Sequence, residues 1–250
     1  MGLQIGQALG RGTRRTLSAS GIVVFVSMLI YQFAVVGAVN TLIANSLPPK
    51  VASEASASGG IGFTFPVSTA VAAGITAVSV LFGAALFFVA TRLLSRELSS
   101  LGSIPLSLVS HRFGWAFLST LAVSLVLSIL IPIGLVMLLV PGIFLAVSFQ
   151  FAIFAVGVED CGPIAALKRS WELATGNRWR LFGLLLLVFV IGAVMGVAGT
   201  FVSLVDPAAG QLVSVVVNSV LVVVTYGILA DAFVQLRGGS TTSAAGTPAL

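Results

Sequence analysis

Residues 113–158 read FGWAFLSTLAVSLVLSILIPIGLVMLLVPGIFLAVSFQFAIFAVGV, a run of 46 positions without a charged side chain. A single helix of that length would be about twice too long for any bilayer, because a membrane helix needs ~20 apolar residues. The run therefore predicts two spans, separated at Ile131-Pro132-Ile133-Gly134 or at Val140-Pro141-Gly142. Proline suits the first turn of a helix, so we place the spans at about 113–137 and 141–158. Pro132 then either kinks the earlier span or lies in the turn.

Shorter charge-free windows on either side hold one span each, predicted at about 21–43, 67–91, 181–204 and 211–233. Hydrophobic residues make up 58% of the chain and charged residues 8%, where soluble domains carry ~25% charge. The mean hydropathy is +1.16. No water-soluble fold buries so much apolar surface, and the single cysteine, Cys161, excludes a disulfide scaffold. The sequence predicts an all-α domain over residues 1–237 with six membrane spans.

The distribution of basic residues orients these spans. With six spans, eleven of the twelve Lys and Arg residues share one side and Lys50 stands alone on the other. With five spans the basic cluster of residues 168–180 would change sides, so the positive-inside rule favours six, with both termini in the cytoplasm and the chain in the cytoplasmic membrane. The apolar run after Arg15 is longer than a signal-peptide core of ~7–15 residues, which indicates an uncleaved first span. We expect a flexible connector at residues 45–65 and a disordered tail at 238–250.

Residues 159–180 form the most informative polar stretch. Pro163 can open a helix and Gly176 can close it, which predicts an amphipathic helix over 163–175 that lies in the membrane interface. Ile164, Leu167, Trp171 and Ala174 share its apolar face, and we expect Asn177 to cap the next span. Either the helix only holds the flanking spans in register, or it senses lipid. The candidate contacts to anionic headgroups are Lys168, Arg169, Arg178, Arg180, Trp171 and Trp179.

A family resemblance rests on residues 141–191. The pattern comprises Pro141-Gly142-Ile143, Gly162-Pro163-Ile164, Ala166-Leu167, Ser170-Trp171, Leu173, Gly176, Trp179-Arg180 and Gly183. It resembles the membrane domain attached to some glycerophosphoryl diester phosphodiesterases, and related six-helix prokaryotic membrane proteins without an assigned function. The resemblance implies an integral membrane module that can anchor a catalytic domain. The chain departs from those enzymes because it holds no soluble catalytic domain and His111 is its only histidine.

Polar residues inside the predicted spans are few. Gln32, Gln150, Asn40 and Asn218 are candidates either for hydrogen bonds between helices or for a polar substrate path. Asp231, the one ionisable residue within a span, is expected to pair with Arg237, Arg92 or Arg96, and the Glu159-Asp160 pair with neighbouring basic residues. Gly192, Gly196 and Gly199 form a small-residue stripe for helix packing, more within the chain than between copies.

The sequence contains no catalytic, cofactor or metal motif, and no basic run typical of nucleic-acid binding. We therefore expect a non-enzymatic integral membrane protein that acts as a scaffold, anchor or accessory in lipid or envelope processes. The alternative is a small permease or exporter without a coupled ion. The expected partners are the bilayer and its anionic headgroups, together with a membrane protein or a second copy of the chain.

Overall fold

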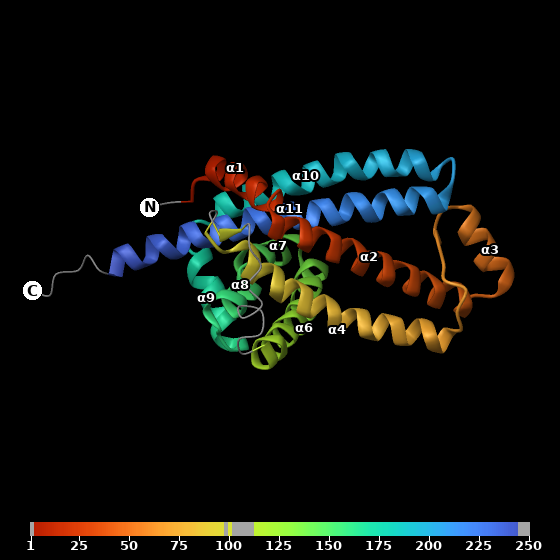
Figure 1. Ribbon diagram of the computed structural model, residues 1–250, viewed down its shortest axis with the longest axis horizontal. Helices are drawn as coiled ribbons and strands as arrows, with labels where there is room; N and C mark the ends of the chain where they lie inside the picture. The colour runs from red at the N-terminus through yellow and green to blue at the C-terminus, as the bar shows by residue number, and fades with distance from the viewer. Residues whose placement is uncertain (1–2, 98–99, 102–112, 245–250) are drawn as a thin grey trace, which may run out of the picture. The chain divides into compact units, whose positions relative to one another are not determined.

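The computed structural model describes residues 3–97, 100–101 and 113–244 (Figure 1). The regular elements of these residues are helices. In chain order they are α1 (Ile5–Thr16), α2 (Ala19–Ser46), α3 (Pro49–Ala57), α4 (Thr69–Leu94), α6 (Phe113–Met137), α7 (Leu139–Phe149), α8 (Ala152–Glu159), α9 (Pro163–Ala174), α10 (Arg178–Ser203) and α11 (Pro207–Ala244).

Six helices are long and apolar enough to cross a membrane, which confirms the six apolar segments expected from the sequence. They cover Ala19–Ser46, Thr69–Leu94, Phe113–Met137, Val140–Glu159, Arg178–Ser203 and Pro207–Gly238. These helices indicate a multi-pass membrane protein.

The turn between the two spans of the long apolar run lies at Leu138, whose backbone is extended. Pro132 is inside α6, so the alternative that placed it in the turn does not hold. α7 begins at Leu139, two residues before Pro141. Proline fits there because the N–H groups of the first helical turn have no partner within the helix.

The segment predicted as the span 141–158 is interrupted. α7 ends at Phe149 and α8 begins at Ala152, so Gln150 and Phe151 form a short break. α8 ends at Glu159, and the capping residue Asp160 has a left-handed conformation with φ of 52°.

Three terminal or connecting regions differ from expectation. The N-terminal arginines belong to a separate helix, α1. The connector 45–65 contains α3, which Pro49 opens at the first position. α11 runs to Ala244, so the first part of the expected tail 238–250 is helical, and residues 245–250 lie outside the described part. The tail has no proline before Pro248 to end the helix earlier.

The chain divides into two compact units. Unit 1 comprises Met1–Val23, Ala84–Leu187 and Val224–Leu250, and unit 2 comprises Val24–Gly83 and Val188–Val223. Helices α2, α4, α10 and α11 each contribute residues to both units.

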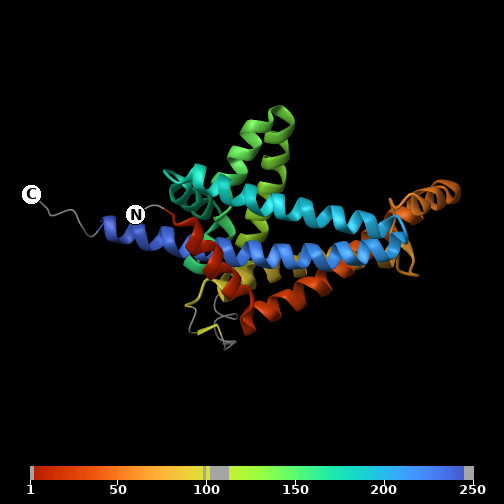
Figure 2. The same ribbon diagram turned by 90° about the horizontal axis from the view of Figure 1, so that it is seen from above.

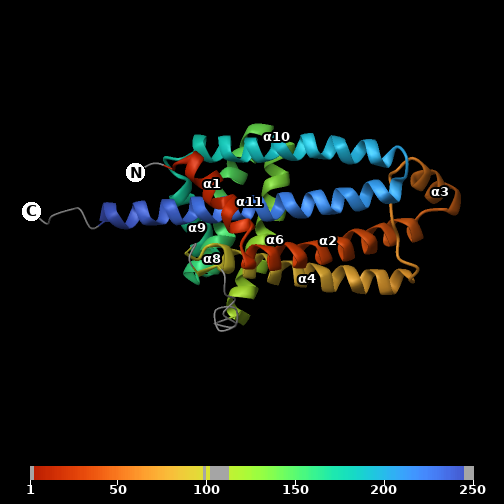
Figure 3. The same ribbon diagram turned by 45° about the horizontal axis from the view of Figure 1, so that its top comes forward.

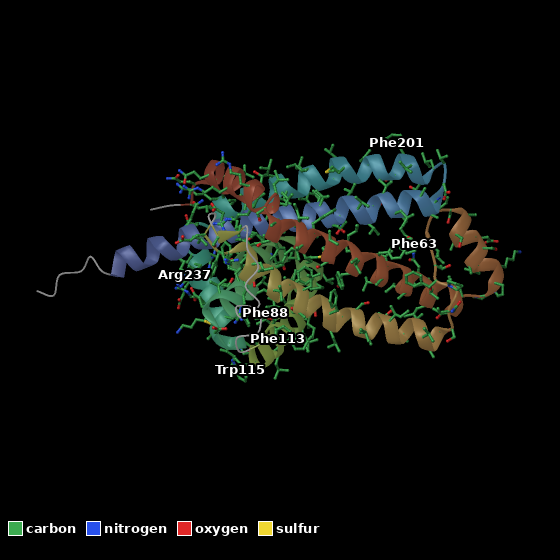
Figure 4. The ribbon with its side chains drawn as sticks, in the orientation of Figure 1. Phe63, Phe88, Phe113, Trp115, Phe201 and Arg237 are labelled. Atoms are coloured by element: carbon green, nitrogen blue, oxygen red, sulfur yellow. The ribbon has the colours of Figure 1, made fainter. Side chains whose placement is uncertain are left out.

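Unit 1 packs around aromatic and small residues. Phe154 stacks on Phe233 and on Tyr226, with ring centroids 5.8 and 5.6 Å apart. Phe88 meets Phe113 edge to face at 5.8 Å, and Figure 4 labels both residues. Small residues let α6, α8 and α9 approach each other in a core of Phe88, Ala116, Val123, Ala152, Ala155, Val156 and Ala166.

Unit 2 contains the other ends of the long helices and the connector. Phe63 and Phe65 of the connector pack on Phe33 of α2, with ring centroids 4.7 and 5.7 Å from it. Asp206 caps α11 by accepting hydrogen bonds from the N–H groups of Ala208 and Ala209.

Candidate functional site

α1 docks on α11 through two glycines. A Cβ atom on Gly227 would lie 2.6 Å from the carbonyl oxygen of Gly12, and one on Gly12 would lie 2.6 Å from the Cα atom of Ile228. Any side chain at either position would therefore meet backbone. Figure 3 shows α1 lying across α11. The contact carries the last turn of α1 to the C-terminal third of the predicted span 211–233.

Arg15, in that last turn, forms a buried ion pair with Asp231. Its Nη2 and Nε atoms lie 3.2 and 3.3 Å from Oδ1 of Asp231, and the two side chains are 4% and 2% exposed. Gln235 donates to the other carboxylate oxygen at 2.8 Å. Arg15 Nη1 also donates to the carbonyl oxygens of Leu94, at 2.7 Å, and Arg96. A cation at the C-terminus of α4 stabilises the free carbonyls there.

The predicted partners of Asp231 were wrong. Arg92 and Arg237 instead bind the two carboxylates that follow α8, and α1 brings in Arg15 from a distance of 216 residues. Local sequence contains no signal for this pair, because it depends on how α1 folds back over α11.

A second charged network surrounds the end of α8. Arg92 pairs with Asp160, donates from Nε to the carbonyl oxygen of Gly157 at 2.8 Å, and lies 4.4 Å above the ring of Phe88. Glu159 accepts from Nε of Arg169 at 3.0 Å and lies 3.6 Å from Nε of Arg237. The expected pairing of Glu159 and Asp160 with basic residues is confirmed.

Other basic residues face outward, and we call Arg11, Arg14, Lys168, Arg178 and Arg180 the basic surface. Arg11, Arg14 and Lys168 are exposed and have no ion-pair partner among the residues that the structure describes. Arg180 is exposed and donates to the carbonyl oxygen of Leu3 at 3.1 Å. The basic surface therefore keeps positive charge that no carboxylate of unit 1 neutralises.

Arg178 has an unusual environment within the basic surface. Its guanidinium lies 4.4 Å above the ring of Trp171 and 4.6 Å above that of Phe144. Its Nη2 donates to Thr175 at 3.3 Å, and its buried Nε has no hydrogen-bond partner in the described part of the chain. A guanidinium held by two aromatic rings keeps free N–H donors for an anion.

The other residues predicted to contact headgroups fall into two groups, those at the surface and those engaged within the protein. Trp179 is 86% exposed and Trp171 is 39% exposed, so both lie at the surface of unit 1. Arg169 is instead engaged by Glu159 and Glu172. Asn177 stands directly before α10, as expected of a cap, and its carbonyl oxygen accepts from the N–H of Leu181 at 3.0 Å. Its side-chain oxygen accepts from the N–H of Leu3 at 3.2 Å.

α9 packs differently from the expected amphipathic pattern. Its buried residues are Ala166, Ser170, Leu173 and Ala174, whereas Ile164 is 84% exposed. Ser170 Oγ accepts from the N–H of Phe151 at 3.1 Å and donates to the carbonyl oxygen of Ser148 at 2.9 Å. Ser170 thus satisfies two backbone groups at the break between α7 and α8, a role that the sequence did not reveal.

The predicted polar residues of the spans belong to different units. Gln150 lies at the break in unit 1, where both of its amide atoms are buried without a hydrogen-bond partner among the described residues. Gln32 donates to Asn218 at 2.7 Å in unit 2. Asn40 donates to Gln211 at 2.7 Å and to the carbonyl oxygen of Phe63 at 3.0 Å. Gln211, which the sequence did not single out, also accepts from the N–H of Phe63 at 2.9 Å.

The predicted glycine stripe lies in unit 2. Added Cβ atoms on Gly192 and Gly199 would lie 3.4 Å from Leu221 and 2.9 Å from Ser214, both on α11, whereas one on Gly196 would meet nothing within 4 Å. Unit 2 also has a largely apolar groove of about 540 Å³ between α2 and α4, lined by Ile30, Tyr31, Ala34, Val71, Gly74, Ile75, Val78, Ser79 and Phe82.

The described ranges contain no group of three or more His, Cys, Asp or Glu side chains that could hold a metal ion. His111 lies outside the described residues.

Comparison with known proteins gives one match. The family described as "Domain of unknown function (DUF7847)" matches residues 3–236. No curated protein and no solved structure matches the chain.

Proposed function

This chain belongs to the DUF7847 family, and from that premise we propose a non-enzymatic multi-pass membrane protein that binds anionic lipid headgroups through its basic surface. It serves as a scaffold, anchor or accessory in lipid or envelope processes. The separation of charges in unit 1 carries the proposal. Carboxylates Glu159, Asp160 and Asp231 are paired with arginines, while the basic surface remains open to an external anion.

Tryptophan supports this assignment. Trp179 lies between Arg178 and Arg180 in the chain, the ring of Trp171 lies 4.4 Å from the guanidinium of Arg178, and tryptophan favours the headgroup level of a bilayer. Under the positive-inside rule the basic surface faces the cytoplasm, with both termini on that side of the cytoplasmic membrane. The anchor role agrees with the resemblance of residues 141–191 to the membrane domain of phosphodiesterases. A membrane protein or a second copy of the chain is the partner that such an anchor would hold.

The test compares lipids of different charge on the full chain. Purified protein in a neutral detergent is titrated with phosphatidylglycerol or phosphatidylcholine, and its melting temperature is followed. We expect phosphatidylglycerol to raise the melting temperature more, because a ligand at 100 times its Kd stabilises by ~2.7 kcal/mol. The triple variant Arg11→Gln, Arg14→Gln, Lys168→Gln should lose most of this difference. Lys50→Gln, an exposed change in unit 2, is the control. Equal responses to the two lipids would contradict the proposal.

A second candidate is a small permease without a coupled ion, and Gln150 favours it. Unpartnered polar groups at a broken membrane helix are typical of transporter binding sites. In proteoliposomes, osmotic swelling with glycerol and with urea would reveal a path. If Gln150 lines one, Gln150→Leu abolishes swelling and leaves the melting temperature unchanged. If wild-type vesicles swell no faster than empty ones, that candidate fails for small neutral solutes.

A further inference from the structure

We infer that α6, α7 and α8 lie within one leaflet on the side of the basic surface and do not cross the membrane. Only α2, α4, α10 and α11 then cross. The inference goes beyond the proposed function. It requires that the protein is inserted in a membrane, but it does not depend on a preference for anionic lipid.

The start of the chain marks one level of unit 1. Leu3 donates its N–H to Asn177, at 3.2 Å, and the next residue, Gln4, donates its N–H to Gln235 at 3.0 Å. Asn177 directly precedes α10, and Gln235 lies on α11. The beginning of α10 and this turn of α11 are therefore at the same depth.

Two points of the α7–α8 segment meet that level. Glu159, the last residue of α8, lies 3.6 Å from Arg237, two residues beyond Gln235. Phe144, in the middle of α7, has its ring 4.6 Å from the guanidinium of Arg178, which follows Asn177. α7 begins only five residues before Phe144, which is ~7.5 Å of helix. The turn at Leu138 therefore cannot reach across a hydrocarbon core of ~30 Å.

α9 leads to the same conclusion from its charges. It packs on α7, α8 and α6, and Ser170 ties it to the break between α7 and α8 (Figure 3). α9 also carries Lys168, Arg169 and Glu172. Charged side chains are strongly disfavoured at the centre of a bilayer. A helix with three of them belongs in the interface, and so does the segment that runs beside it.

The exposed surface of α6 indicates that lipid acyl chains cover this helix. Most exposed side chains along its length are apolar or aromatic, among them Trp115 53%, Leu118 58%, Leu125 62%, Ile129 55%, Ile133 51% and Val136 86%. The exposed hydroxyl of Ser128 donates to the carbonyl oxygen of Leu125 in the same helix. Figure 2 shows the α6–α7 hairpin leaving the part of α11 in the same unit at a steep angle. An uncharged hairpin of this kind is not stable in water. Beside headgroup-level residues, the acyl chains of the same leaflet cover it.

The charge distribution is the same for four crossings as for six. Residues 113–158 contain no charge, and an in-plane hairpin leaves both of their ends on one side. Eleven basic residues therefore share the cytoplasmic face in either arrangement.

The test measures distances by double electron–electron resonance on the full chain in lipid nanodiscs, with Cys161→Ser as background. Nitroxides replace Leu138 and Thr175, both exposed. We expect a distance below ~20 Å, because Phe144 is ~9 Å of helix from Leu138 and adjoins Arg178. Six crossings would separate the labels by ~30 Å or more. A Thr175–Val205 pair, whose labels lie just beyond the two ends of the 26-residue helix α10, supplies the measured reference for a crossing helix, which is itself ~39 Å long.

Ile133 provides a second label position near the turn, for the case in which the Leu138 variant does not fold. A nitroxide at Val136 adds a depth measurement by relaxation with oxygen and with a water-soluble nickel chelate. Short distances with preferential oxygen relaxation support the inference. A distance near the α10 reference overturns it, because the hairpin then crosses. Short distances with preferential nickel relaxation also overturn it, because the hairpin then lies in water and not among acyl chains.

Discussion

The two units hold their helices together by different chemistry. In unit 1, α1 joins α11 through the buried pair of Arg15 and Asp231. In unit 2, α2 joins α11 through neutral amides such as Gln32 and Asn218. The charged residues of unit 2 are exposed. Separating a buried charge from its partner costs far more than separating two amides, since a charge resists transfer from water much more strongly than a neutral amide does. Stability should therefore depend more strongly on single residues in unit 1.

The largest effect should come from Asp231→Leu. It leaves Arg15 buried without a counterion, at a cost of ~3–5 kcal/mol. We expect a large loss of folded, monodisperse protein in size-exclusion chromatography. The double variant Arg15→Met, Asp231→Leu should recover much of it, because it removes both charges. A single variant as stable as wild type would show that the pair is hydrated in solution.

The glycine contact should rank next. Gly12→Leu places a side chain against the backbone at Ile228 and should destabilise by about 1–3 kcal/mol. The matched control is Gly10→Leu, on the same helix with nothing within 4 Å of an added Cβ. Melting temperatures of the two variants measure the effect. The same loss in both would indicate that α1 does not dock on α11 as described.

Neutral amides of unit 2 should matter less. Asn218→Leu and Gln32→Leu each remove one half of a hydrogen bond of 2.7 Å between helices. Such bonds contribute ~0.6 kcal/mol on average and ~1.7 at most. A double-mutant cycle on melting free energies gives the coupling directly. A coupling as large as that of Arg15 with Asp231 would remove the contrast between the units.

The smallest expected effect is a change in the rate at which maleimide labels Cys161. Burial, and then the carboxylate of Glu159, raise the pKa of this thiol. Maleimide reacts with the thiolate, so labelling is slow at pH 7 and should rise about tenfold per pH unit until the raised pKa is reached. Glu159→Gln should lower that pKa and speed labelling at pH 7 several-fold. An unchanged labelling rate would mean that Glu159 does not raise the pKa of the Cys161 thiol.

The same thiol reports the side of the membrane. With the basic surface in the cytoplasm, a membrane-impermeant maleimide should leave Cys161 unlabelled in intact cells and label it after permeabilisation. Labelling of intact cells would place the basic surface outside.

The sequence predicted the apolar helices well because length and charge-free windows are local properties. It also predicted the pairing of Glu159 and Asp160, whose arginine partners outnumber the local carboxylates. It failed for the partner of Asp231 and for the role of Ser170, because both contacts join residues that only tertiary packing brings together. The positive-inside rule cannot tell whether residues 113–158 cross the membrane, because this segment contains no charged residue and both of its ends lie on the same side in either arrangement.

The pairing of Arg15 with Asp231 also orders events during synthesis. The ribosome makes Arg15 216 residues before Asp231, so the guanidinium on α1 has no counterion until α11 has been made. A product truncated before α11 would never close this contact, and its undocked α1 would be open to the proteases that survey the membrane.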